Sequence, residues 1–239
     1  MEQVYLQTYS LGKAMEEAFL TSLEKVAQIG YSGVEFAGGY GGMEAEKLKT
    51  YLAQLDLAPI SSHVGLDKIE AQLPYLAALG ASYVICPGTP LNTYDEIMAK
   101  AEEMNRIGKL AKEQGLTFGY HNHYAEFNQV QDQYVLDLLL QNTDPACVTL
   151  QLDAGWAAYA GIDPAAYLAQ HAGRCSLLHV KEAHNEKTGC GIIDWQNVIR
   201  AARESGVAAC IVEREGVYEN KDIFSCVAED LMYLHNQIQ

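Results

Sequence analysis

Short apolar segments alternate with longer amphipathic segments along the whole chain, and this alternation predicts the fold. The apolar segments are rich in β-branched residues and are too short for helices, so they predict strands that are buried on both faces. We expect eight of them, at Val4–Leu11, Gly33–Phe36, Ala58–Gly65, Tyr83–Cys86, Thr117–His123, Val148–Asp153, Cys175–Lys181 and Ala209–Glu213.

The segments between these strands carry apolar residues at helical spacing, and several of them end at a glycine. Asp163 is placed to cap the helix that Pro164 begins. The pattern predicts eight helices, at Ala14–Ile29, Glu44–Leu57, Lys68–Leu79, Tyr94–Gln114, Asp132–Leu140, Pro164–His171, Asp194–Glu204 and Asp222–His235.

Strict alternation of strands and helices with short connections indicates a parallel sheet with right-handed crossovers. Eight such units in 239 residues fit a closed (β/α)₈ TIM barrel, which we expect to form a single domain over residues 1–239. An open doubly wound sheet is the alternative, but it usually carries a G-x-G-x-x-G turn after its first strand. Gly12-Lys13-Ala14-Met15 stands there instead, so the barrel is favoured.

Ionisable residues follow the predicted strands at their C-terminal ends, where a barrel of this kind builds its active site. His121 and His123 are two residues apart, so an extended backbone directs both side chains to one face. A charged group inside an apolar strand is costly unless it is paired or binds a metal. Their concentration at one end therefore predicts a shared site. The other strand ends carry Glu35, His63, Cys86, Asp153, His179, Lys181, Glu182, Glu213 and Glu215.

Each residue taken alone has a simpler interpretation. Glu35 could pair with a neighbouring cation, His63 could be a hydrogen-bonded core histidine, and Asp153 could cap the turn that follows it. The glycine-rich segment at residues 38–42, GGYGG, lacks the lysine of a phosphate-binding loop. We interpret it as a mobile lid or substrate loop.

The composition argues against several classes of partner. The formal net charge is −15, with 16 Lys and Arg against 31 Asp and Glu, which opposes binding to nucleic acids or anionic membranes. No apolar run approaches the ~20 residues that span a bilayer, and the first residues lack the pattern of a signal peptide. The six cysteines show no C-x-x-C pair, as expected for reduced thiols in a cytoplasmic protein.

Six motifs cover most of the chain from Gly30 onward, and they read GYSGVEF, GYHNHYAEF, LQLDAGWAAYAGIDP, GRCSLLHVKEAH, GIIDWQNVIRAARESGV and IVERE. In order and spacing they resemble the sugar phosphate isomerase/epimerase superfamily of xylose isomerase-like barrels. That superfamily includes inosose dehydratases, hydroxypyruvate isomerases, ketose 3-epimerases and apurinic-site endonucleases. The resemblance implies an enzyme of carbohydrate metabolism that acts on a small sugar or cyclitol, and a homo-oligomer is compatible with it.

The resemblance also implies a divalent metal, held by His121, Asp153, His179 and Glu213 at the ends of the fifth to eighth strands. Many relatives have Glu where this chain has His121. The imidazole lowers the negative charge of the site and removes one candidate base, and His123 could share the ligand role. Mixed imidazole and oxygen ligands suit Mn²⁺ or Zn²⁺ best, with Mg²⁺ or Co²⁺ as alternatives.

The implied reaction begins with removal of a proton next to a carbonyl, through an enediolate that a metal stabilises. We expect Glu213 or Glu35 to be the base, Glu182 or a histidine to return the proton, and Lys181 to assist them. Few cations stand near the strand ends, which favours an unphosphorylated substrate. We expect this substrate to contact His63, His123, Tyr124, Glu126 and Trp156.

Several functions remain open from the sequence. A metal-dependent isomerase or epimerase is the first hypothesis. An inosose-dehydratase-like lyase begins with the same proton removal and then expels a hydroxyl group, so the residues hardly separate the two. A non-catalytic sugar-binding barrel is the third hypothesis. An endonuclease is the least favoured, because the surface is acidic and the further histidines of a three-zinc site are not evident.

Overall fold

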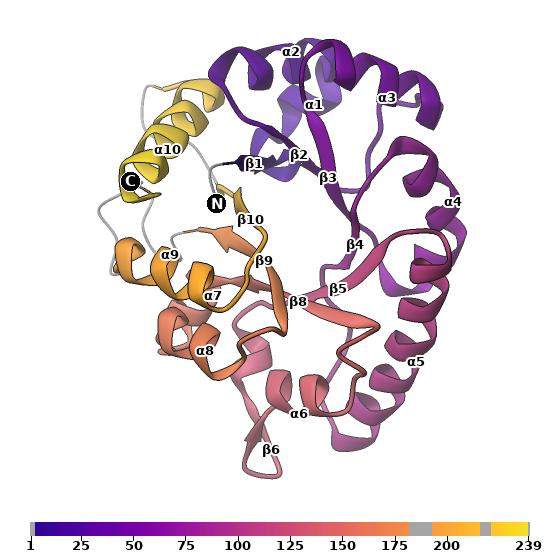
Figure 1. Cartoon of the computed structure of the whole chain (residues 1–239), viewed down its shortest axis with the longest axis vertical. Coiled ribbons are helices and arrows are strands. Elements are labelled where there is room, and N and C mark those ends of the chain that lie inside the picture. The colour runs from indigo at the N-terminus through magenta and orange to yellow at the C-terminus, as the bar shows by residue number, and fades with distance from the viewer. Residues whose placement is uncertain (1–2, 182–192, 216–220, 239) are drawn as a thin grey trace.

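A computed structural model describes residues 3–181, 193–215 and 221–238. Within these residues, eight parallel strands close into a barrel in which β10 returns to pair with β1 (Figure 1). The predicted (β/α)₈ barrel is therefore confirmed. In barrel order the strands are β1 (Val4–Gln7), β2 (Gly33–Phe36), β3 (Ala58–His63), β4 (Tyr83–Cys86), β5 (Thr117–His121), β8 (Val148–Asp153), β9 (Cys175–Val180) and β10 (Ala209–Val212).

Helices lie around the outside of the barrel (Figure 1). Side chains alternate between the two faces of a strand, so those on the outward face of the sheet can pack against this helical layer. The helices are α1 (Lys13–Glu17), α2 (Phe19–Ile29), α3 (Ala45–Gln54), α4 (Ile69–Leu79), α5 (Tyr94–Glu113), α6 (Val135–Gln141), α7 (Ala154–Tyr159), α8 (Pro164–Gln170), α9 (Trp195–Glu204) and α10 (Ile223–Ile238).

The first predicted strand and helix are both shorter than expected. The strand ends at Gln7, because Thr8–Leu11 form a 3₁₀ helix whose first turn is capped when the Gln7 side chain accepts a hydrogen bond from Tyr9 N. The helix predicted over 14–29 divides at Ala18, where φ is −150° and ψ is 62°. Ser22 Oγ donates to Ala14 O at 2.8 Å and ties the two pieces together.

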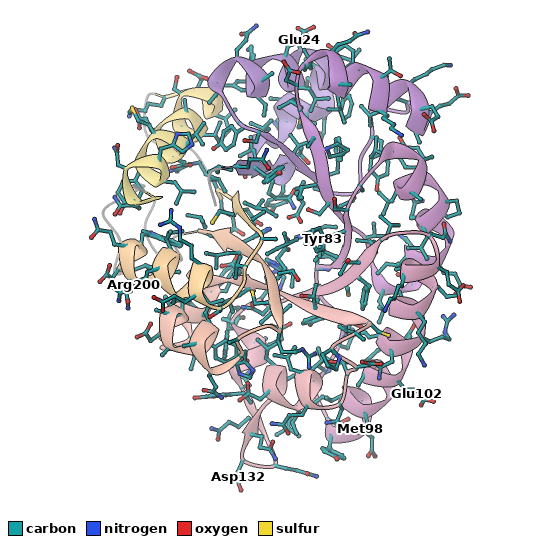
Figure 2. The ribbon with its side chains drawn as sticks, viewed as in Figure 1. Glu24, Tyr83, Met98, Glu102, Asp132 and Arg200 are labelled. Atoms are coloured by element: carbon teal, nitrogen blue, oxygen red, sulfur yellow. The ribbon has the colours of Figure 1, made fainter. Side chains whose placement is uncertain are left out.

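A short hairpin replaces the start of the helix predicted at 132–140. Its strands are β6 (Gln129–Val130) and β7 (Gln133–Tyr134), and they pair antiparallel. The two residues between them have positive φ, 51° at Gln131 and 61° at Asp132, as a tight two-residue hairpin requires. Figure 2 shows Asp132 at the outer end of this hairpin, so the helix begins at Val135.

The inside of the barrel is apolar near the start of the strands. Tyr5, Ile85, Leu177, Ala209 and Ile211 form a buried cluster there, and Tyr83, labelled near the centre of Figure 2, packs against it. Side chains alternate along a strand, so the residue two positions further on also faces the interior. Two positions beyond this apolar cluster, the inward-facing residues of several strands are polar.

Most of the cysteines are buried as free thiols. The cysteines at 86, 147, 175, 210 and 226 are buried and form no disulfide, whereas Cys190 lies outside the described residues. Burial raises the pKa of the Cys175 thiol to about 12, so it stays protonated and inert. Over the described ranges, none of the helices combines the length and the apolarity needed to cross a bilayer.

Candidate active site

Four side chains with metal-binding atoms meet at the C-terminal end of the barrel. His121 ends β5, Asp153 ends β8, His179 lies in β9 and Glu213 follows β10. One ligand atom from each lies within 4.8 Å of the other three. The structure therefore brings together the four residues that the resemblance implies as ligands.

The His179 ring lies between carboxylates on both of its nitrogen sides. Its Nε2 is 2.7 Å from Glu35 Oε1, and its Nδ1 is 2.9 Å from Glu213 Oε2 and 3.9 Å from Asp153 Oδ2. His121 Nε2 is also 3.9 Å from Asp153 Oδ2. Two ring nitrogens and two carboxylates thus face one small volume.

The atoms facing this volume fit a cation. Asp153 Oδ2 and His179 Nδ1 are buried, and neither forms a hydrogen bond in the described part of the chain. The contact between His179 Nδ1 and Glu213 is close, but it is not aligned as a hydrogen bond. A buried polar atom without a partner is costly. A divalent ion would satisfy both atoms, and two imidazoles with two carboxylates suit Zn²⁺ or Mn²⁺.

The pKa shifts of three of these residues agree with this fit. Burial raises the pKa of Asp153 to about 7, although Lys181 opposes the shift. Burial, with the charge of His179, lowers the pKa of His121 well below its usual value, which leaves the neutral form that binds metals. Burial alone would lower the pKa of His179, but Glu35 and Glu213 outweigh it and raise the value to about 10. In the metal-free chain His179 therefore carries a positive charge, which offsets part of the negative charge of Glu35 and Glu213.

Glu35 is a fully buried carboxylate on β2 that supports the imidazole rings. Besides His179, it contacts His63 Nε2 at 3.0 Å. Burial alone would raise the pKa of Glu35, but these two histidines lower it well below its usual value. Three further side chains donate to its oxygens: Gln7 Nε2 at 2.7 Å, Ser61 Oγ at 2.5 Å and Gln151 Nε2 at 2.7 Å.

A cavity of about 540 Å³ opens at this end of the barrel, a size typical of small-molecule sites. His63, His121, His123 and Glu213 contribute to its wall, and Tyr9, which is 60% exposed, lies at its edge. The fully buried Glu35 lies behind this wall. Its position does not suit the proton-abstracting role expected from the sequence, since a base must reach a substrate carbon.

Lys181 is buried beside the candidate ligands, where we expected a catalytic group. Its Nζ lies 3.1 Å from Glu213 Oε1 and 2.7 Å from Glu215 Oε1, and 4.4 Å above the centre of the Trp156 ring. Burial would lower the pKa of Lys181, but Glu213 and Asp153 raise it. Lys181 therefore stays charged and holds Glu213 in place. Glu182 lies outside the described residues.

The residues predicted to contact substrate divide into two groups. His63 and His123 contribute to the cavity wall, and Tyr124, which is 49% exposed, lies beside the Trp156 ring with centroids 5.6 Å apart and the ring planes tilted by 48°. Glu126 instead folds back into the protein. Its Oε1 accepts from Tyr120 OH at 2.7 Å and its Oε2 accepts from His123 N at 2.9 Å, so it shapes the turn that carries His123 and is not among the residues that line the cavity.

Residues 23–225 match the family model described as Xylose isomerase-like TIM barrel. The chain belongs to this family. The resemblance inferred from the motifs is thereby confirmed. Curated relatives of this barrel include an inosose dehydratase of Clostridium tetani, 28% identical over 141 residues, which are 59% of this chain and 46% of the relative. Another, from Clostridium beijerinckii, is 27% identical over 199 residues, 72% of this chain and 65% of the relative.

The chain thus spans about half to two thirds of the length of the curated relatives it matches. Among solved structures, this xylose isomerase-like barrel superposes on a sugar phosphate isomerase/epimerase from Parabacteroides distasonis with a TM-score of 0.89. The two are 26% identical, and the match covers 98% of this chain and 95% of the other. An L-ribulose 3-epimerase shares the fold, with a TM-score of 0.81 at 16% identity, covering 100% and 95%.

Sequence reasoning missed the layer of Gln7, Ser61 and Gln151 beneath the candidate metal-binding atoms of this barrel. Each is polar, has no exposed surface and lies within a strand of the barrel. Gln151 stands two positions before Asp153, so the pleat places both on the inner face. Gln151 could have been predicted from this spacing, because a polar residue two positions from a candidate ligand faces the same side of the strand.

We expect Asp153→Asn to stabilise the metal-free protein while abolishing metal binding. The asparagine Oδ1 keeps the cap on Trp156 N, which Asp153 makes at 2.8 Å, and the amide removes a buried charge. Because the folded pKa of Asp153 is raised to about 7, its charged form opposes folding increasingly as the pH rises toward that value and fully above it. The gain in unfolding free energy at about pH 8 should be on the order of 1 kcal/mol or more.

Urea denaturation with chelator present measures this difference. Asp163→Asn is the matched control, because Asp163 caps α8 at Ala165 N in the same manner without an unpartnered buried oxygen. It should shift the unfolding free energy by less than about 0.5 kcal/mol. A metal-free Asp153→Asn protein less stable than the unaltered one would contradict the interpretation of Oδ2.

Proposed function

We propose that this chain is a divalent-metal-dependent isomerase or epimerase that removes a proton next to the carbonyl group of a sugar or cyclitol. The observation that carries the proposal is the set of four donor atoms within 4.8 Å of one another, beside a cavity of about 540 Å³. The similarity to a sugar phosphate isomerase/epimerase at 26% identity supports the same reaction class.

His121, Asp153, His179 and Glu213 would hold the metal, which when bound supplies a Lewis acid for the carbonyl and neighbouring hydroxyl oxygens of the substrate. Glu213 is the carboxylate of this set that also contributes to the cavity wall. Its Oε1 is held by Lys181 at 3.1 Å, so it is oriented toward the cavity as a proton acceptor. His123 is also part of the wall and is placed to return a proton.

Lys181 keeps Glu213 ionised for this role. Burial alone would raise the pKa of Glu213, but contact with His179 and the charge of Lys181 lower it. A base must be deprotonated before it can take a proton from carbon. We assign Glu35 to positioning the histidine rings, in place of the alternative that it acts as the base.

The charge around the cavity supports an unphosphorylated substrate. Lys181 is bound by two carboxylates, and Arg214 forms a buried two-point ion pair with Asp230 at 2.7 and 2.6 Å. Phosphate recognition needs cations that are directed at the ligand. Lys68 is the only lysine or arginine among the described residues that line the cavity, and its side chain is exposed.

The partners, the location and the oligomeric state of the protein are also proposals. The net charge of −15 supports an enzyme without nucleic-acid or anionic membrane partners. A single domain over residues 1–239 and a cytoplasmic location remain predictions from the sequence. A homo-oligomer stays a prediction from the resemblance.

A dehydratase is the second candidate, because the curated relatives are inosose dehydratases. Both reactions start with the same proton removal, so products decide between them. Turnover of candidate keto sugars and cyclitols in D₂O, followed by NMR and mass spectrometry, should give deuterium at a stereocentre without loss of water for an isomerase or epimerase. A product lighter by one water would identify the lyase, and binding without turnover of any candidate would leave a sugar-binding barrel.

Removal of the metal should abolish activity. Protein purified without chelator should contain about one Mn, Zn, Co or Mg per chain, as one four-ligand site requires, measured by elemental analysis. Activity should disappear after dialysis against EDTA and return when Mn²⁺ or Zn²⁺ is added. Full activity in a sample shown to be metal-free would refute metal dependence.

Glu213→Gln should lower kcat by at least about 10²-fold, since the amide cannot accept the substrate proton. Glu215→Gln is the matched control. It removes the other carboxylate partner of Lys181, at 2.7 Å, but its side chain is 50% exposed, so we expect a reduction of less than about tenfold. Steady-state kinetics on metal-loaded proteins measures both, and an equal loss in the two variants would mean that Glu213 is not the base.

A further inference from the structure

Gln151 occupies the centre of the polar layer, although it is not one of the metal-binding residues. Its side chain has no exposed surface. Its Oε1 lies 2.8 Å from His63 Nε2 and 3.1 Å from His121 Nδ1, and its Nε2 lies 2.7 Å from Glu35 Oε2. One amide therefore contacts three groups of the candidate site.

The direction of these hydrogen bonds is set by the backbone. Tyr9 N can only donate, and it donates to Gln7 Oε1 at 3.1 Å. Gln7 must then turn its Nε2 toward Glu35, where it donates at 2.7 Å. The Glu35 carboxylate accepts this bond and a second one from Ser61 Oγ. Because an ionised carboxylate has no proton to give, Gln151 must present its NH₂ group to Glu35 and its carbonyl oxygen to the histidines.

A carbonyl oxygen beside an imidazole nitrogen requires that nitrogen to carry the proton. His121 therefore has its proton on Nδ1, which leaves the lone pair of Nε2 on the side of Asp153 Oδ2, 3.9 Å away. Glu35 acts on His179 in the same way but at the other nitrogen, because it contacts Nε2 at 2.7 Å. His179 thus turns Nδ1 toward the same volume, so with a metal bound the two candidate ligands would keep their protons at opposite nitrogens.

We propose that Gln151 is a positioning residue that fixes His121 as the Nδ1–H tautomer, so that Nε2 is presented to the metal. This inference rests on the proposed function, because it explains how His121 comes to present an unprotonated nitrogen to the metal. Partners of a ligating histidine commonly set its tautomer and its ring orientation. Gln151 is suited to this task because an amide supplies the donor that Glu35 needs and the acceptor that His121 needs.

Gln151→Met tests the proposal, since methionine has similar length but cannot accept the ring proton strongly. The control is Thr149→Val on the same strand. Thr149 Oγ1 bonds Ser176 Oγ at 2.7 Å, so the control loses a buried hydrogen bond without changing a contact to the histidines. Long-range ¹H–¹⁵N NMR of the metal-free proteins reads the tautomer of His121, and chelator competition measures Zn²⁺ affinity.

We expect the unaltered protein and Thr149→Val to show His121 as Nδ1–H, and Gln151→Met to show loss of this single tautomer. Zn²⁺ affinity should fall about 10–100-fold in Gln151→Met, as for other partners of metal-binding histidines, and by less than about twofold in Thr149→Val. An unchanged tautomer in Gln151→Met, or an unchanged affinity, overturns the proposal.

The tautomer in the unaltered protein also decides the matter without any variant, even if Gln151→Met does not fold. Nε2–H on His121 overturns the inference. Nδ1–H supports it, and does so whether or not the protein binds metal. Failure of the unaltered protein to bind Zn²⁺ or Mn²⁺ would instead overturn the proposed function, so the two failures are distinguishable.

Discussion

A buried negative charge at Glu35 is the interaction on which the inner part of this barrel depends. A carboxylate without exposed surface would be strongly destabilising if it were unpaired. Here it receives hydrogen bonds from Gln7, Ser61 and Gln151 and contacts two histidine rings. These contacts reach β1, β3, β8 and β9 from a single residue on β2. The same carboxylate that needs these partners also orients them, so the geometry of the candidate site follows from the need to satisfy one buried charge.

Residues that stabilise the barrel and residues of the candidate site occupy different levels along the barrel axis. The interior cluster around Leu177 and Ile211 is apolar, and one step along the pleat leads to His179 and Glu213. Each strand can therefore contribute a packing residue and a functional residue to the same interior, two positions apart. The apolar layer excludes water from below, which strengthens the electrostatic interactions above it.

The candidate site is not arranged for maximum stability. Asp153 Oδ2 and His179 Nδ1 are left without hydrogen bonds within the described residues, although the layer beneath them is fully hydrogen-bonded to Glu35. Polar groups that are costly in the isolated chain become favourable once a cation lies among them. This contrast between a satisfied support and an unsatisfied centre is the pattern expected where binding, rather than folding, completes the interactions.

The sequence by itself determined the architecture and the end of the barrel that carries the ionisable residues, and the resemblance of its motifs to a known family implied the four candidate ligands. Alternating hydrophobic periods are local properties, and a closed parallel barrel brings the C-terminal ends of its strands together whatever their separation in the chain. The hairpin at Gln131 and Asp132 and the break at Ala18 were missed because they involve too few residues to produce a period. The hydrogen bonds of Glu126 with Tyr120 OH and His123 N were also missed, because they depend on how one turn folds back.

The tertiary structure alone decided which acidic residue faces the cavity and which lies behind it. Glu35 and Gln151 are 116 positions apart, and their contact crosses the inside of the barrel. It depends on the register between neighbouring strands, including the shifts between β2 and β3 and between β8 and β9. A register shift of one residue reverses the face of every side chain on a strand, and local sequence patterns do not encode it. For that reason the candidate ligands could be named before the structure was known, whereas the residues that orient them could not.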